Sequence, residues 1–103
     1  MIKKIRTRFN PEQEKVLESI LKEVRHACSV NGYVASGSEG TIFERSHGGG
    51  RITPTYHIGV YKNNKHIATI TIVLDNNIRA WSEYHKLLDR PRFVKKIVHR
   101  LTR

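Results

Sequence analysis

The hydrophobic positions between residues 10 and 32 repeat with the period of an α-helix. Apolar side chains lie on one stripe of such a helix, at Val16, Leu17, Ile20, Leu21, Val24, Ala27 and Cys28. Asn10 can accept a hydrogen bond at the helix start, Pro11 suits the first turn, and Gln13 can reach back to the cap. Asn31-Gly32 is a typical helix end, since glycine tolerates left-handed backbone. The sequence therefore predicts a helix between these two signals.

From Tyr33 the pattern changes to short strands separated by turns. The stretch 37–40 holds two glycines and a serine, and it predicts a turn. A strand is expected over 41–46, followed by a flexible hairpin tip at 47–50, where three glycines stand in a row. This segment therefore predicts the first strand of an antiparallel sheet.

Two further strands are expected on either side of Asn63-Asn64, which is a tight-turn signal. The first covers 51–62, where Pro54 lacks a backbone donor and so indicates an edge position or a bulge. The second covers 65–75 and is apolar on both faces, which is typical of a central strand.

The C-terminal part predicts two more helices. Residues 78–88 carry apolar side chains at helical spacing, although a fourth strand at Ile78–Glu83 is the rival interpretation. On such a helix Trp81 and Tyr84 would lie one turn apart, packed in the core or, as the alternative, stacking on an exposed base. The last helix, about 91–102, has an apolar stripe at Phe93, Val94, Ile97, Val98 and Leu101.

These elements predict one α+β domain over residues 1–103, with a three-stranded antiparallel sheet packed on helices. The expected order is (β)-α-β-β-β-α-α, in which the first, weak strand or arm is 2–9. No stretch approaches the roughly 20 apolar residues of a membrane span, and no secretory signal is visible. Cys28 stands alone, so no disulfide and no cysteine-based zinc site is expected. We therefore expect a cytoplasmic protein without a metal or cofactor.

The charge distribution is the most informative feature for function. The chain carries a formal charge of +10, and residues 9–89 hold nine basic and nine acidic side chains. The excess therefore belongs to the two ends, which contain no acid. Its members are Lys3, Lys4, Arg6 and Arg8 at one end and Arg90, Arg92, Lys95, Lys96, Arg100 and Arg103 at the other.

Most of the C-terminal cations fall on one face of the last helix, at positions 92, 95, 96, 99, 100 and 103. Such a face suits a phosphate backbone, because each neutralised phosphate releases condensed counterions. The first hypothesis is therefore a nucleic-acid-binding protein, RNA or a structured duplex being favoured over DNA. Arg51, beside the glycine-rich tip, is expected to assist by pairing with phosphate. A basic helix can also contact a membrane or a protein, or simply keep the chain soluble.

The order α-β-β-β-α, with a basic last helix and a hairpin loop, resembles the double-stranded-RNA-binding domain in architecture only. The resemblance implies contacts with successive minor grooves and the phosphates between them. In that family the basic cluster lies at the start of the last helix, a place that Arg90, Arg92, Lys95 and Lys96 match loosely. The predicted helix 78–88 is an element that the family lacks.

A small metal-independent ribonuclease toxin is a second hypothesis. The stretch 37–43 distantly resembles the Gly-Ser-His region of small toxins that share the same fold, with Glu39 where their catalytic histidine would stand. Proton transfer and charge stabilisation could otherwise come from His57, His66, Glu44, Arg45, Arg51, Tyr84 and His85. Hairpin pairing could bring Tyr61 or His57 near His66.

The third hypothesis is a compact inhibitor or adaptor from a phage or other mobile element. Small basic domains can occupy nucleic-acid channels or acidic patches on large enzymes. This hypothesis predicts a stable protein complex and poor affinity for free nucleic acid, and the sequence names no target.

Overall fold

The computed structural model describes residues 9–75, 77–85 and 90–103, and it is an α+β fold with four strands between two helices. The predicted strand or arm at 2–9 lies outside the described residues except for Phe9, which is buried in the core. The elements are α1 (Pro11–Asn31), β1 (Val34–Ser46), β2 (Gly49–Lys62), β3 (Lys65–Leu74), β4 (Ile78–Tyr84) and α2 (Arg92–Leu101).

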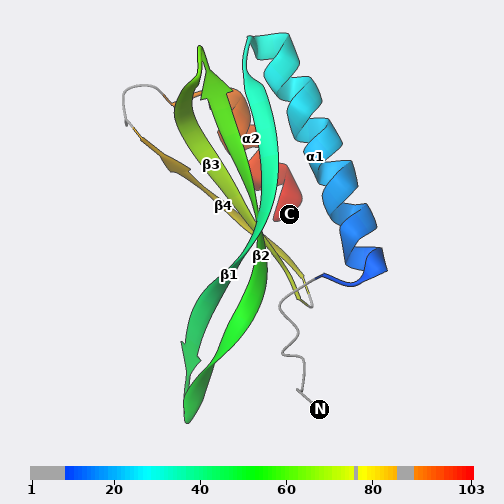
Figure 1. Ribbon diagram of the computed structural model, residues 1–103, viewed down its shortest axis with the longest axis vertical. Coiled ribbons are helices and arrows are strands. Elements are labelled where there is room, and N and C mark those ends of the chain that lie inside the picture. The colour runs from blue at the N-terminus through cyan, green and yellow to red at the C-terminus, as the bar shows by residue number, and fades with distance from the viewer. Residues whose placement is uncertain (1–8, 76, 86–89) are drawn as a thin grey trace.

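The four strands form one antiparallel sheet in the order β1-β2-β3-β4. The predicted three-stranded sheet was therefore one strand short. The pairing of β2 with β3 begins at Tyr56, so residues 49–55 pair with β1 alone, and the two strands continue as a long ribbon (Figure 1). Pro54 lies in this ribbon, where one side of β2 has no partner strand. The expected edge position is thus met locally, although β2 as a whole lies inside the sheet.

The helix α1 begins and ends where the sequence predicts. The side chain of Asn10 accepts a hydrogen bond from the backbone N–H of Gln13 at 2.8 Å, and the side chain of Gln13 accepts one from the N–H of Asn10 at 2.9 Å. Gly32 ends the helix with a left-handed φ of 81°. Gln13 also donates to the carbonyl of Leu74 at 3.3 Å, which ties the start of α1 to the end of β3.

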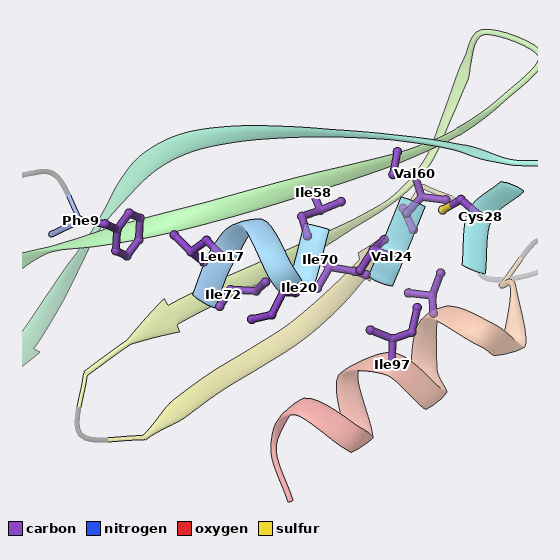
Figure 2. Packing of buried hydrophobic residues seen from close by; sticks show 13 residues of the cluster. Phe9, Leu17, Ile20, Val24, Cys28, Ile58, Val60, Ile70, Ile72 and Ile97 are labelled. Carbon is purple, nitrogen blue, oxygen red and sulfur yellow. The ribbon is translucent and has the colours of Figure 1, made fainter. Parts of the chain in front are cut away.

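Both helices cover the same face of the sheet, because one hydrophobic cluster contains side chains from each of them. Figure 2 shows Val24 of α1 and Ile97 of α2 beside Ile70 of the central strand β3. Ile70 and Val24 are completely buried, as is Cys28. Burial raises the pKa of the Cys28 thiol to about 11, so it stays neutral and acts as a small apolar side chain.

The turn predicted at 37–40 is wrong, since these residues lie inside β1. The glycines serve a different purpose there: a Cβ on Gly37 would overlap with the ring of Tyr56, and one on Gly40 would lie 2.9 Å from Nε2 of His57. Both rings come from β2 and lie across the β1 backbone. The glycines are therefore required by close packing rather than by a change of chain direction.

The helix predicted at 78–88 is also wrong over its described residues 78–85, where the rival strand is correct, and residues 86–88 lie outside the described part of the chain. Ile78, Ala80 and Tyr84 pack on the main core, which is the alternation of a strand. Ala80 and Tyr84 are four residues apart, a spacing that places both on one face of either a helix or a strand. The apolar spacing alone therefore did not distinguish the two structures. The tertiary structure decides, because β4 pairs with the edge of β3 that β2 leaves free. Trp81 alternates with these residues along β4 and so lies on the opposite face of the sheet. Its predicted packing in the main core is therefore wrong.

The β1–β2 and β2–β3 turns each consist of two residues. Asn63 and Asn64 both have left-handed backbone, with φ of 52° and 63°, which confirms the predicted two-residue turn. The tip between β1 and β2 is reduced to His47-Gly48, because the strands extend to Ser46 and Gly49. The expected tip of 47–50 was therefore too long.

Candidate nucleic-acid interface

The helix α2 is oriented by its apolar stripe, as the sequence predicts. Val94 and Ile97 are buried in the core, and Phe93 contacts the ring of Tyr33 with 5.3 Å between centroids. The opposite face of the helix is therefore held toward solvent. Its exposed side chains are Arg92, Lys95, Lys96, His99 and Arg100, and together with Arg103 just beyond the helix end we call them the α2 basic face.

The long side chains of the α2 basic face surround a groove of about 640 Å³. Arg100 pairs with Glu23 of α1, so part of its charge is used within the fold. In the described part of the chain, no carboxylate lies within ion-pair distance of Arg92, Lys95 or Lys96. These three side chains therefore present their positive charge to solvent.

Arg90 lies next to the start of α2, with its guanidinium 6.0 Å from the centre of the Tyr84 ring. Arg90 and Pro91 line a cavity of about 480 Å³ at the end of the sheet, together with Lys62 and Lys65. Sequence reasoning missed these two lysines. The signal was present, because residues that flank a two-residue turn stand opposite each other in a hairpin.

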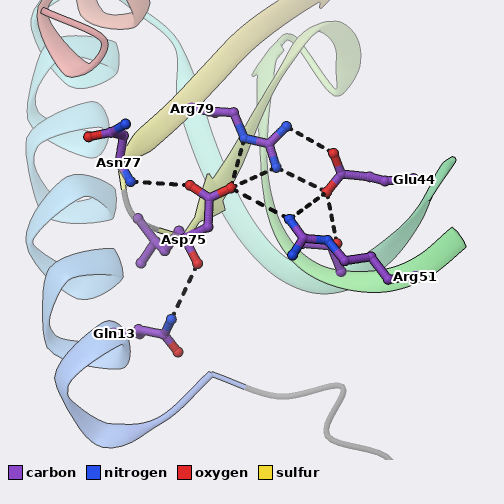
Figure 3. A network of polar contacts seen from close by, with 8 residues as sticks. Gln13, Glu44, Arg51, Asp75, Asn77 and Arg79 are labelled. Atoms are coloured by element: carbon purple, nitrogen blue, oxygen red, sulfur yellow. Dashed lines mark hydrogen bonds and ion pairs between the residues drawn. The ribbon is translucent and has the colours of Figure 1, made fainter. Parts of the chain in front are cut away.

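Arg51 does not join these cations. It lies on the β1–β2 ribbon, where its guanidinium is 3.7 Å from Glu44 and 3.9 Å from Asp75. Figure 3 shows that Arg79 of β4 reaches the same two carboxylates, with 3.0 Å to Glu44 and 2.9 Å to Asp75. The contact of Arg79 with Glu44 links β4 to the β1–β2 ribbon, and Arg51 shares both carboxylates with Arg79. The predicted phosphate contact of Arg51 is not tested by this placement.

The same network gives a testable pH dependence. Hydrogen bonds from Arg79 and then from Thr53 lower the pKa of Glu44 from 4.5 to about 2. Because the pKa of Glu44 is lower in the folded than in the unfolded chain, its ionised carboxylate stabilises the fold. This stabilisation is complete above the unfolded pKa and is lost as the pH falls from about 4.5 toward 2. We expect Glu44→Gln to lower the free energy of unfolding at pH 7 and to reduce its fall between pH 5 and pH 2.5.

Chemical denaturation at a series of pH values measures this effect. Glu83→Gln is the matched control, since Glu83 is exposed on β4 and has no ion pair among the described residues. Equal pH profiles for Glu44→Gln and the wild type would contradict the role given to the network.

The N-terminal cations Lys3, Lys4, Arg6 and Arg8 lie outside the described residues. Their convergence with the α2 basic face therefore remains a prediction. The described residues place the C-terminal cations on one helix face and bring Arg90 beside two lysines of the β2–β3 hairpin.

The histidines suggested for catalysis lie on the sheet. His57 is held between two threonines, with Nε2 at 2.7 Å from the hydroxyl of Thr55 and Nδ1 at 3.2 Å from that of Thr71. Thr55 and Thr71 are themselves buried. Both ring nitrogens of His57 are thus used in hydrogen bonds within the sheet.

His66 stands opposite Tyr61 in the hairpin register, whereas His57 stands opposite Thr71. The Nδ1 atom of His66 lies 2.6 Å from Nε2 of His85, and its Nε2 lies 2.6 Å from the hydroxyl of Thr69. Among residues 9–75, 77–85 and 90–103, no three His, Cys, Asp or Glu side chains gather as a metal site. The two histidine groups are therefore separate hydrogen-bonded clusters of the sheet.

Comparison of the chain with protein-family models, curated proteins and solved structures gave no match. Within the described residues, neither α1 nor α2 combines the length and apolar character that a membrane crossing requires. The function is therefore argued from the residues and their arrangement.

Proposed function

We propose that this protein binds nucleic acid, RNA or a structured duplex in particular, through the α2 basic face and the adjoining cations at the end of the sheet. The observation that carries the proposal is the outward charge of Arg92, Lys95 and Lys96, which no carboxylate of the described residues neutralises. A polyanion can contact all three without breaking an ion pair of the fold.

The dimensions of the α2 basic face suit a phosphate backbone. Arg92 and Arg100 are eight residues apart on α2, and at about 1.5 Å rise per residue this part of the face is roughly 12 Å long. At about 3.4 Å per nucleotide along one strand of a duplex, this length corresponds to roughly four phosphates. Contacts of this kind position a protein on a duplex without reading its sequence, so we expect weak sequence preference.

The burial of the apolar stripe favours a polyanion over a membrane surface. An amphipathic helix binds a bilayer by inserting its apolar side, but Val94 and Ile97 of α2 are already buried in the core. What α2 presents to a partner is charge. Long-range attraction to a polyanion follows from this arrangement.

A salt titration of binding tests the proposal. The pure protein is titrated into labelled double-stranded RNA, double-stranded DNA and single strands at several salt concentrations. Four phosphate contacts by Arg92, Lys95, Lys96 and Arg103 predict a slope of log affinity against log salt of about −3.6 for duplex DNA. Absence of binding at low salt, or a slope near zero, would refute it and would favour an acidic protein as the partner.

A further inference from the structure

The cavity at the end of the sheet is a distinct feature beside the α2 basic face. Its volume is about 480 Å³, which is within the usual range of small-molecule sites. The residues that line it come from the start of β1, the β2–β3 hairpin and the start of α2. They are Tyr33, Lys62, Asn63, Lys65, Ile67, Arg90 and Pro91.

The β2–β3 hairpin sets the positions of two of the three cations in this cavity. The left-handed turn at Asn63-Asn64 places Lys62 and Lys65 opposite each other in the hairpin register. A register shift follows at once: Tyr61 pairs with His66 and Val60 with Ala68, so Ile67 has no opposite residue. Such a bulge turns the end of the hairpin relative to the rest of the sheet.

Among the described residues, the charged side chains that line the cavity are all basic. Its lining includes three cations and, among the described residues, no carboxylate. In the same part of the chain no acid lies within ion-pair distance of Lys62 or Lys65. Because Lys62 and Lys65 are register partners that line one cavity, an anion bound there would be attracted by both charges.

Tyr33 limits what the ligand can be. The ammonium of Lys62 lies 4.9 Å from the centre of the Tyr33 ring, and the ring of Phe93 lies against Tyr33 at 5.3 Å. These neighbours compete with a base for the ring of Tyr33. The cavity is therefore better suited to a charged group than to a stacked base.

The start of α2 adds to the positive potential. Pro91 is the N-cap of α2 and lines the cavity, and no side chain caps the helix there. The first turn of α2 contains no acidic residue. The positive end of the helix dipole thus lies at the edge of a cavity that already contains three cations.

We propose that this cavity is a binding pocket for a phosphate group, held by Lys62 and Lys65 with Arg90 at the rim. At about 30 Å³ per water molecule the cavity has room for roughly sixteen waters, so it can accept two linked phosphates or a terminal phosphate with its sugar. The phosphate belongs either to a free nucleotide or to the end of a nucleic-acid strand. Binding of a strand end rests on the nucleic-acid-binding function proposed above, whereas phosphate binding in the pocket does not.

Calorimetry with pyrophosphate tests the pocket directly. We compare the wild type with Lys62→Ala/Lys65→Ala and with the control Lys15→Ala/Lys22→Ala, which removes the same charge from the exposed side of α1. We expect the wild type and the control to bind pyrophosphate equally, and the pocket variant to bind it at least tenfold more weakly. No binding by the wild type, or equal binding by all three proteins, would overturn the proposal.

A second arm distinguishes the two sources. Oligonucleotides with a 5′-phosphate or a 5′-hydroxyl are titrated into the same three proteins. A preference of the wild type for the 5′-phosphate that disappears in the pocket variant supports the end of a strand. Pyrophosphate binding without such a preference supports a free nucleotide. If all oligonucleotides bind but pyrophosphate does not, the pocket is refuted while nucleic-acid binding by α2 stands.

Discussion

Replacing Arg92, Lys95 and Lys96 together by glutamine should weaken binding to duplex nucleic acid by about two to three orders of magnitude near 0.1 M salt. Each lost phosphate contact changes the salt slope by about 0.9 for duplex DNA, so three contacts reduce its magnitude by about 2.7. In the proposed mode these side chains contact the phosphate backbone, so the loss should be similar for unrelated sequences.

The matched control for this triple variant is Lys15→Gln/Lys22→Gln/Arg25→Gln. These three cations are exposed on α1, and the substitutions change the net charge by the same amount. If binding depended only on net charge, both triple variants would lose affinity equally. Equal losses, or an unchanged slope in the α2 variant, would contradict the assignment of the interface to α2.

The substitution Ile70→Ala should have the largest effect on stability. Ile70 lies on the central strand β3, is completely buried, and belongs to the cluster that joins the sheet to the helices. Removing its side-chain atoms leaves a cavity, and the expected loss is about 2–5 kcal/mol of unfolding free energy. For a domain of this size a loss of about 3 kcal/mol lowers Tm by roughly 12–20 °C.

Thermal unfolding followed by circular dichroism measures this change. Val34→Ala is the control, because Val34 is at the start of the edge strand β1 and 67% exposed. It should change stability by no more than about 0.5 kcal/mol. A small effect of Ile70→Ala, similar to that of the control, would mean that the core is not packed as described.

The elements with local start and stop signals could be predicted from the sequence. Asn10, Gln13 and Gly32 define α1 through contacts only a few residues apart, and the structure shows the reciprocal hydrogen bonds. The turn at Asn63-Asn64 is equally local. In α2, a regular apolar stripe was sufficient to predict which face would be buried.

The errors concern residues whose roles depend on distant partners. Gly37 and Gly40 indicate a turn when considered alone, and only the rings of Tyr56 and His57 on the neighbouring strand explain them. The segment of β4 was predicted as a helix, with a strand as the rival interpretation, because Ala80, Trp81 and Tyr84 have helical spacing. The strand forms because it pairs with β3, and the spacing of apolar residues within the segment does not reveal this pairing.

In the candidate site, too, features set by nearby residues could be predicted and features set by distant partners could not. The α2 basic face could be predicted because its cations are regularly spaced on one helix. The grouping of Lys62 and Lys65 with Arg90 could not, since Arg90 lies 25 residues beyond Lys65 along the chain. The sequence also did not reveal that Glu44 and Asp75 lie beside Arg51, whose predicted phosphate contact stays untested.

The most direct test is a map of amide chemical shifts in the isotope-labelled protein as duplex RNA or DNA is added. Binding through α2 predicts that the largest shifts occur at residues 90–103, with smaller ones at Lys62 and Lys65 and none at Lys15 or Trp81. Shifts concentrated around Trp81 and His57 on β4 and β2, with α2 unchanged, would contradict the proposed interface.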